Sequence, residues 1–201
     1  MIEPEAKHWL LPQAEVWSEI KARLKQHFQL VKMAEENRCI TFFDDDDWHL
    51  WQAEYLFFHE QKNIYTLTSS KDHGSSITTA ATPKFYWETP QGSTHDTLKR
   101  LIKLRALQAI GELVLHTTRY QLVNKHKVIA QLQLTVNSTS KKAKIPSSTY
   151  IGLLVFDNTG THEALIVKTL GQSALQSHPA VGYRQQLLTL GLKPSPAATT
   201  S

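Results

Sequence analysis

Alternating charges near the start of the chain are the first feature that could do chemistry. Glu3, Glu5 and Lys7 stand two residues apart, and residues at this spacing share one face of a β-strand. Two carboxylates there can hold a divalent cation, and the ammonium group can contact a phosphate. The same alternation is common on the solvent face of an edge strand, and Pro4 inside the run fits an edge or first strand.

The composition is that of an ordinary globular protein. The chain has 201 residues, of which 41% are apolar and 20% charged. No apolar run is long enough to span a membrane, and charges throughout the first thirty positions argue against a signal peptide. The single cysteine, Cys39, excludes an internal disulfide and a cysteine-based zinc site, so we expect a cytoplasmic protein. The net charge of +4 allows a polyanionic partner without requiring one.

Hydrophobic periodicity predicts the elements that would position these charges. Apolar residues at three- and four-residue steps predict a helix from Pro12 to Phe28, and further helices are expected at 96–109, 162–175 and 181–190. Apolar or alternating runs predict strands at 38–43, 54–59, 64–69, 84–88, 112–123, 127–136 and 149–157. We therefore expect an α+β fold, an antiparallel β-barrel with flanking helices, as one domain over 1–192 with a disordered tail or linker over 193–201.

The spacing of Glu3, Glu5 and Lys7 resembles the E-x-E-x-K signature of the CYTH family, also called triphosphate tunnel metalloenzymes. The resemblance extends over nearly the whole chain. It includes an aromatic and acid-rich segment at 38–50, an arginine at the position of Arg119, the strand, turn and helix at 151–164, which are similar to the inorganic triphosphatase branch, and a closing Leu-x-Pro-Ser at 192–195. It implies a closed or nearly closed barrel whose tunnel holds triphosphate with Mg²⁺ or Mn²⁺.

Several charged positions that the resemblance implies are missing. Active relatives carry two arginines on the strand at 54–59, whereas this chain offers either Phe57 and His59 or Phe58 and Glu60, depending on the strand register. The next strand should end in a lysine, which only one register supplies, as Lys71. The polar face of the strand at 127–136 has amides in place of carboxylates, and Gly152, Leu154 and Phe156 stand where two or three glutamates are expected. The tunnel residues that remain as predicted ligand-binding groups are Glu3, Glu5, Lys7, His59, Lys71, Arg119, Gln131 and Gln133, of which Glu3 and Glu5 are the weak metal ligands.

These losses predict a degenerate CYTH-like domain, catalytically inactive or weak, that binds a phosphorylated small molecule, a polyphosphate or a protein partner. No catalytic residue and no certain cofactor is assigned. The alternative is a metal-dependent inorganic triphosphatase with rearranged ligands, which would use Mg²⁺ or Mn²⁺. No membrane association is expected.

Two further clusters have simpler interpretations. A basic helix face made of Lys99, Arg100, Lys103 and Arg105 could bind a polyanion or nucleic acid, but no aromatic residue interleaves with it, so a solvated face is favoured. The four aspartates at 44–47 could bind a cation, but they lack the spacing of a calcium loop. A solvated turn that caps the following segment is the favoured interpretation.

Overall fold

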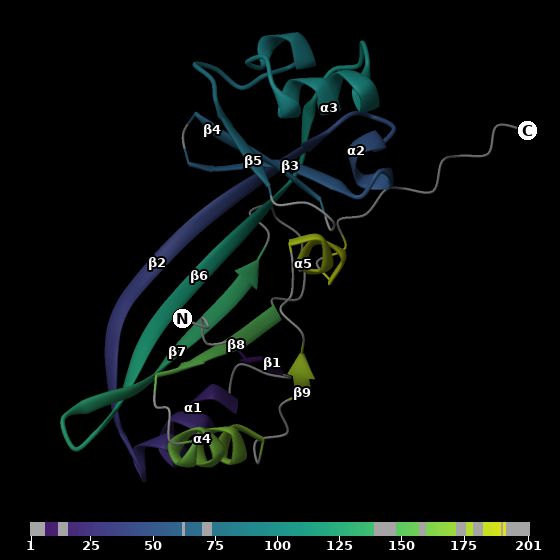
Figure 1. Cartoon of the computed structure of the whole chain (residues 1–201). Helices are drawn as coiled ribbons and strands as arrows, with labels where there is room; N and C mark the ends of the chain where they lie inside the picture. The colour runs from purple at the N-terminus through teal and green to yellow at the C-terminus, as the bar shows by residue number, and fades with distance from the viewer. Residues whose placement is uncertain are drawn as a thin grey trace, which may run out of the picture. The chain divides into compact units, whose positions relative to one another are not determined.

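The computed structural model describes residues 7–11, 16–61, 63–69, 74–138, 148–156, 160–171, 176–178, 183–189 and 191. These residues form two compact units. Unit 1 contains the described residues of 1–37, 115–138 and 143–190, and unit 2 contains those of 38–114 together with residue 191. Strands β2 (Gln29–Asp44) and β6 (Gln108–Asn124) contribute residues to both units (Figure 1).

Unit 1 is a sheet with helices packed against it. Its strand order is β2-β6-β7-β8-β1-β9, and the pairs β7–β8, β8–β1 and β1–β9 are antiparallel. The added strands are β7 (Lys127–Ser138), β8 (Ser148–Val155), β1 (Lys7–Leu11) and β9 (Gln176–His178), and the helices are α1 (Val16–Lys25), α4 (Thr161–Gly171) and α5 (Tyr183–Thr189).

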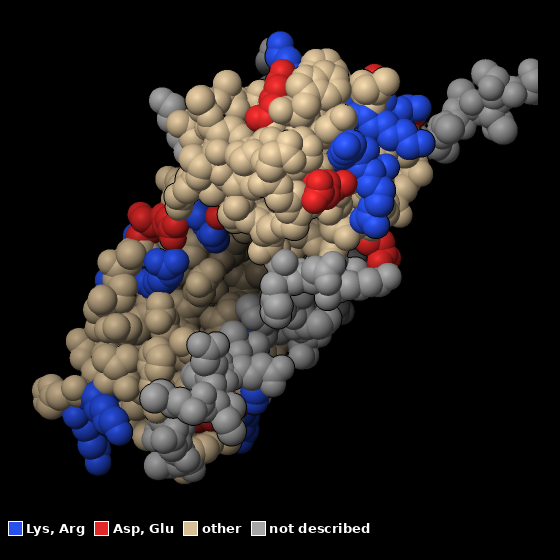
Figure 2. Space-filling view, turned by 45° about the horizontal axis from the view of Figure 1, so that its top comes forward, with Lys and Arg blue, Asp and Glu red and all other residues tan. Residues whose placement is uncertain are grey.

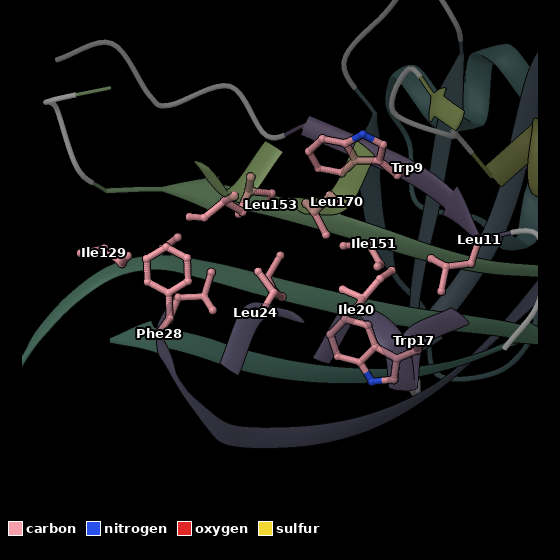
Figure 3. Close-up of a cluster of buried hydrophobic side chains, with 14 residues drawn as sticks. Trp9, Leu11, Trp17, Ile20, Leu24, Phe28, Ile129, Ile151, Leu153 and Leu170 are labelled. Atoms are coloured by element: carbon pink, nitrogen blue, oxygen red, sulfur yellow. The ribbon is translucent and has the colours of Figure 1, made fainter. Parts of the chain in front are cut away.

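The core of unit 1 lies between the sheet and helices α1 and α4. Ile20 and Leu24, four residues apart on α1, are both fully buried, as the helical period predicts. They face Ile151 and Leu153 of β8, which are 0% and 1% exposed (Figure 3). Truncating such a buried Leu or Ile to Ala typically costs about 2–5 kcal/mol. This face of the sheet, called the core face below, therefore holds unit 1 together.

Unit 2 is built in the same way from a different part of the chain. Its strand order is β5-β4-β3-β2-β6, with β3 (Tyr55–Gln61), β4 (Ile64–Ser69) and β5 (Ser75–Thr78) paired antiparallel. Helices α2 (His49–Gln52) and α3 (Ser93–Ile102) and the 3₁₀ helix η1 (Tyr86–Glu88) complete it. Phe43, Phe57 and Tyr65 form its core with Leu50 of α2 and Leu98 of α3.

The predicted closed barrel is wrong for the described residues. Their hydrogen-bonded strand order begins at β5 and ends at β9 without closing. These two edge strands have only four and three residues, so each offers few backbone groups for closure. The α+β class and the antiparallel pairing are as expected.

Two predicted elements of unit 2 also differ from the structure. The expected strand at 84–88 is instead the 3₁₀ helix η1. The helix expected at 96–109 is α3, which starts at Ser93 and ends at Ile102, where Lys103 takes a left-handed φ of 52°. A residue in this conformation cannot continue a right-handed helix, so the basic residues at 103 and 105 lie beyond it.

Candidate ligand-binding face

The two faces of the unit 1 sheet are defined by the pairing of β7 with β8. Gln131 lies opposite Leu154, and Gln133 lies opposite Gly152. Directly paired residues share a face, and alternate residues along a strand share it too. These four residues therefore lie on the face opposite the core face, which bears Leu153. This second face is called the polar face below.

Hydroxyl and amide groups extend the polar face from β7 to β6. The Gln133 Nε2 atom donates a hydrogen bond to Thr135 Oγ1 at 3.4 Å, and Thr135 Oγ1 lies 3.3 Å from Thr117 Oγ1 of β6. Arg119 is two residues beyond Thr117 and so shares its face, whereas Tyr120 packs on the core face against Trp17 with ring centroids 5.3 Å apart. Arg119, Gln131 and Gln133 are thus three predicted ligand residues on one face of one unit.

Arg119 is held by a carboxylate on the polar face. Its Nη2 donates a hydrogen bond to Glu36 Oε2 of β2 at 2.9 Å. The two side chains are 38% and 40% exposed, so water screens this ion pair strongly. A phosphate oxygen could therefore replace the carboxylate at modest energetic cost.

Lys7 lies on the other face of the sheet. β1 pairs with β8 so that Lys7 is opposite Leu153 and Trp9 is opposite Ile151, and Trp9 is part of the unit 1 core. The Lys7 Nζ atom bonds Glu163 Oε1 of α4 at 2.6 Å. The structure therefore does not bring Lys7 together with Arg119, Gln131 and Gln133.

His59 belongs to the core of unit 2. It lies on the strand face of Phe57, with its ring centroid 5.6 Å from Phe43 and 5.3 Å from Tyr65, and burial lowers the pKa of its imidazole. Phe58 pairs with Phe42 on the opposite face. The sequence left two registers open for this strand. In the structure, Phe58 and Glu60 face away from α2 and α3, and His59 faces toward them.

The remaining predicted ligands, Glu3, Glu5 and Lys71, lie outside the described residues. Three residues of the polar face were missed by the sequence interpretation: Glu36, Thr117 and Thr135. Thr117 and Thr135 could have been found, because each is in phase with a predicted ligand two residues away. Glu36 could not, because the expected strand began at Arg38 and the observed β2 begins at Gln29.

The described part of the polar face does not fit a carboxylate site for Mg²⁺ or Mn²⁺. Such sites use hard oxygen ligands, mostly carboxylates, and β8 presents Gly152 and Leu154 here. Over the described ranges as a whole, no three His, Cys, Asp or Glu side chains are grouped closely enough to hold a metal ion. We derive no reaction step through a metal.

The acidic turn of unit 2 serves as a helix cap. The carboxylate of Asp44 accepts hydrogen bonds from the backbone N–H groups of Asp45, Leu50 and Trp51, and Asp45 accepts from the backbone and the ring of His49. Burial raises the pKa of Asp44, although its three backbone donors act in the opposite direction. Capping is confirmed, but the expectation of a solvated turn is wrong for Asp44 and Asp45, which are 1% and 0% exposed.

Comparison with known proteins supports the fold. No known family matches the chain, and no curated protein matches it. Among solved structures, it is similar to HpAC1 from Hippeastrum, a candidate adenylyl cyclase described as having a dominant triphosphatase activity. That similarity has a TM-score of 0.57 and 12% identity over 89% of this chain and 92% of the other. We conclude that the chain has a CYTH-like fold.

Two other solved structures resemble the chain more weakly. A candidate adenylate cyclase from Bacillus halodurans has a TM-score of 0.45 and 16% identity over 92% of this chain and 96% of the other. A candidate adenylate cyclase from Vibrio parahaemolyticus has a TM-score of 0.41 and 10% identity over 92% and 97%. Among the described helices, none is long and apolar enough to cross a membrane.

Proposed function

We propose that this chain is a CYTH-like domain that binds a phosphorylated ligand, such as a triphosphate or polyphosphate, on the polar face of unit 1 without turning it over efficiently. The observation that carries the proposal is the β7–β8 register, which places Gln131 and Gln133 on one face with Gly152 and Leu154. That face has hydrogen-bond donors for phosphate oxygens, and β8 gives it no carboxylate for a metal.

Each polar group has a defined role in this proposal. The guanidinium group of Arg119 supplies the positive charge and donates to phosphate oxygens, in place of the Glu36 carboxylate. The amide groups of Gln131 and Gln133 donate hydrogen bonds without adding charge. The hydroxyl group of Thr135 can do the same, whereas that of Thr117 is buried beside Thr135 and can only orient it.

The same arrangement argues for slow turnover. Cleavage of a triphosphate requires stabilisation of the negative charge that develops on the transferring group. Removal of one preorganised donor typically costs about 10²–10³ in rate. The described strands of unit 1 give this face one guanidinium group, that of Arg119, and it is already paired with Glu36. We therefore expect binding with little hydrolysis.

Thermal unfolding in the presence of inorganic tripolyphosphate, with and without Mg²⁺ or Mn²⁺, tests the proposal. A ligand at 100 times its Kd stabilises the folded state by about 2.7 kcal/mol, which raises the melting temperature of a chain of this size by about 5–10 °C. Arg119→Ala should remove most of that shift. Lys7→Ala is the matched control, because it also removes one cation from an ion pair, on the core face.

Phosphate release is measured on the same samples. We expect little or no release above the buffer rate with either metal. Rapid Mn²⁺- or Mg²⁺-dependent release would instead establish the alternative, a metal-dependent triphosphatase. A tripolyphosphate shift that survives Arg119→Ala but is lost in Lys7→Ala would place the binding site on the wrong face and refute the proposal.

A further inference from the structure

An exposed aromatic pair stands out on the surface of unit 2. The rings of Phe85 and Trp87 are stacked, with centroids 4.4 Å apart and planes inclined by 5°. Trp87 is 50% exposed. Tryptophans are enriched where proteins bind partners. Half of this side chain is therefore available to a partner.

Contacts on both sides hold this aromatic pair against helix α3. The ring of Tyr86, between Phe85 and Trp87 in the chain, lies 5.2 Å from His95 of α3 in an edge-to-face contact. The backbone N–H of Leu107 donates a 2.6 Å hydrogen bond to the carbonyl oxygen of Lys84. The segment 84–88 is thus fixed beside both the start of α3 and the chain that follows it.

The outer face of α3 and its continuation are basic. Leu98 and Ile102 are buried, which turns Lys99 and Arg100 outward, and Lys103 follows directly and is exposed. Lys99 lies one helical turn after His95 and on the same side of α3. His95 is the residue that contacts Tyr86. In Figure 2, lysine and arginine side chains gather in a blue patch on unit 2.

Positive charge exceeds negative charge in this region, which we call the aromatic-basic patch. Arg105 is paired with Asp47 and is not counted. The patch contains Lys84, Phe85, Trp87, Lys99, Arg100 and Lys103, and its carboxylates are Glu88 and Asp96. Four cations against two carboxylates leave an excess of two positive charges. The Glu88 carboxylate also accepts backbone hydrogen bonds from Lys84 and Phe85, which reduces its repulsion of an anion.

We infer that the aromatic-basic patch binds single-stranded nucleic acid. Proteins that bind single strands combine cations that follow the phosphates with aromatic rings on which bases stack. The segment 96–109 alone contains no aromatic residue, so its sequence argues against this function. The fold supplies the missing rings from Phe85, just before η1, and Trp87, within it, which lie nine or more residues earlier in the chain.

Binding of a short fluorescein-labelled oligothymidylate by the full chain, followed by anisotropy at low salt, tests the inference. Trp87→Ala should weaken binding about tenfold to a hundredfold, because one base loses its stacking partner. Trp87→Phe retains a ring and should recover most of the affinity. Each variant is first checked for an unchanged melting temperature, so that loss of binding is not loss of folding.

The basic residues are tested through the salt dependence of the same binding. Each phosphate contact contributes about −0.7 to the slope of log K against log salt for single strands. Lys99→Ala should make the slope shallower by about that amount. Lys168→Ala, which removes an exposed lysine from α4 of unit 1, is the matched control and should leave affinity and slope unchanged.

Two results would overturn the inference. One is the absence of anisotropy change at low salt. The other is binding that depends on Lys99 but is unaffected by Trp87→Ala, since a purely ionic surface would not discriminate nucleic acid from other polyanions. Excess inorganic tripolyphosphate, which has no bases, should compete poorly with the oligothymidylate. Strong competition would show that the surface is purely ionic and would also overturn the inference.

Discussion

The two faces of β8 differ in what their side chains meet. On the core face, Ile151 and Leu153 are buried against helices α1 and α4. On the polar face, Gly152 and Leu154 are only partly buried and lie opposite Gln133 and Gln131. At Gly152 and Leu154, the second face therefore contributes less to stability than the first, and its side chains are freer to vary there.

This difference explains how a CYTH-like fold can persist without the charges that the resemblance implies. The free energy of folding comes mainly from burial of apolar surface, and much of that surface lies on the core face and in the separate core of unit 2. Replacement of a glutamate by Gly152 or Leu154 on the polar face removes a ligand but opens no cavity in either core. Ligand chemistry and fold can then change independently.

The largest expected effect comes from placing the same charge on each face in turn. Leu153→Glu buries an unpaired carboxylate where the native side chain is 1% exposed, and it should destabilise the fold by about 3–5 kcal/mol. Leu154→Glu meets water on the polar face and should cost about 1 kcal/mol or less. Urea unfolding measures both, and equal losses would mean that the two faces are equally dry.

The sequence predicted the alternation of β7 correctly. Gln131 and Gln133 alternate with apolar residues, and that period is enough to place them together on a half-buried strand. The α1 periodicity was likewise sufficient for its buried residues. These are cases in which one local pattern and the tertiary packing agree.

The sequence could not place Lys7 or His59. The alternation of Glu3, Glu5 and Lys7 suggested a ligand face, but Trp9 is in phase with Lys7 and takes part in the core, so burial of the tryptophan decided the orientation. His59 failed for another reason. Phe57 and Phe58 are both large, apolar and buried, so hydrophobicity alone cannot choose between two registers that differ by one residue.

A smaller effect on stability is expected in unit 2. The two faces of β3 also differ, and His59 lies on the face that packs against the aromatic core. Burial lowers the pKa of His59, and its Nδ1 atom has no hydrogen-bond partner among the described residues. The unfolded chain therefore binds a proton more readily than the folded one. The stability associated with neutral His59 is present above the ordinary pKa of 6.5 and is lost as the pH falls toward the folded-state pKa.

The pH dependence of urea unfolding tests this prediction. The difference in stability between wild type and His59→Leu should shift in favour of the variant as the pH falls below about 6.5. His126→Asn, at an exposed turn position with φ of 67°, is the control, since asparagine tolerates this conformation. Parallel pH profiles for wild type and His59→Leu would show that His59 titrates normally and is not part of a dry core.

The smallest expected effect compares the two ion pairs on opposite faces of unit 1. Arg119–Glu36 and Lys7–Glu163 are both partly exposed, and such pairs typically contribute about 0.2–1 kcal/mol. Glu36→Gln and Glu163→Gln should therefore change stability by similarly small amounts.

The two variants should differ in ligand binding, because a phosphate on the polar face competes with Glu36 for Arg119, whereas Glu163 holds a lysine on the core face. We expect Glu36→Gln to tighten tripolyphosphate binding about two- to fivefold, the range that corresponds to loss of a competing surface pair, and Glu163→Gln to leave it unchanged. Calorimetric titration measures both affinities. If Glu36→Gln weakened binding and the loss were greatest with Mg²⁺ present, Glu36 would be acting as a metal ligand rather than a competitor, and the polar face would have to be reconsidered as a site with a carboxylate of its own.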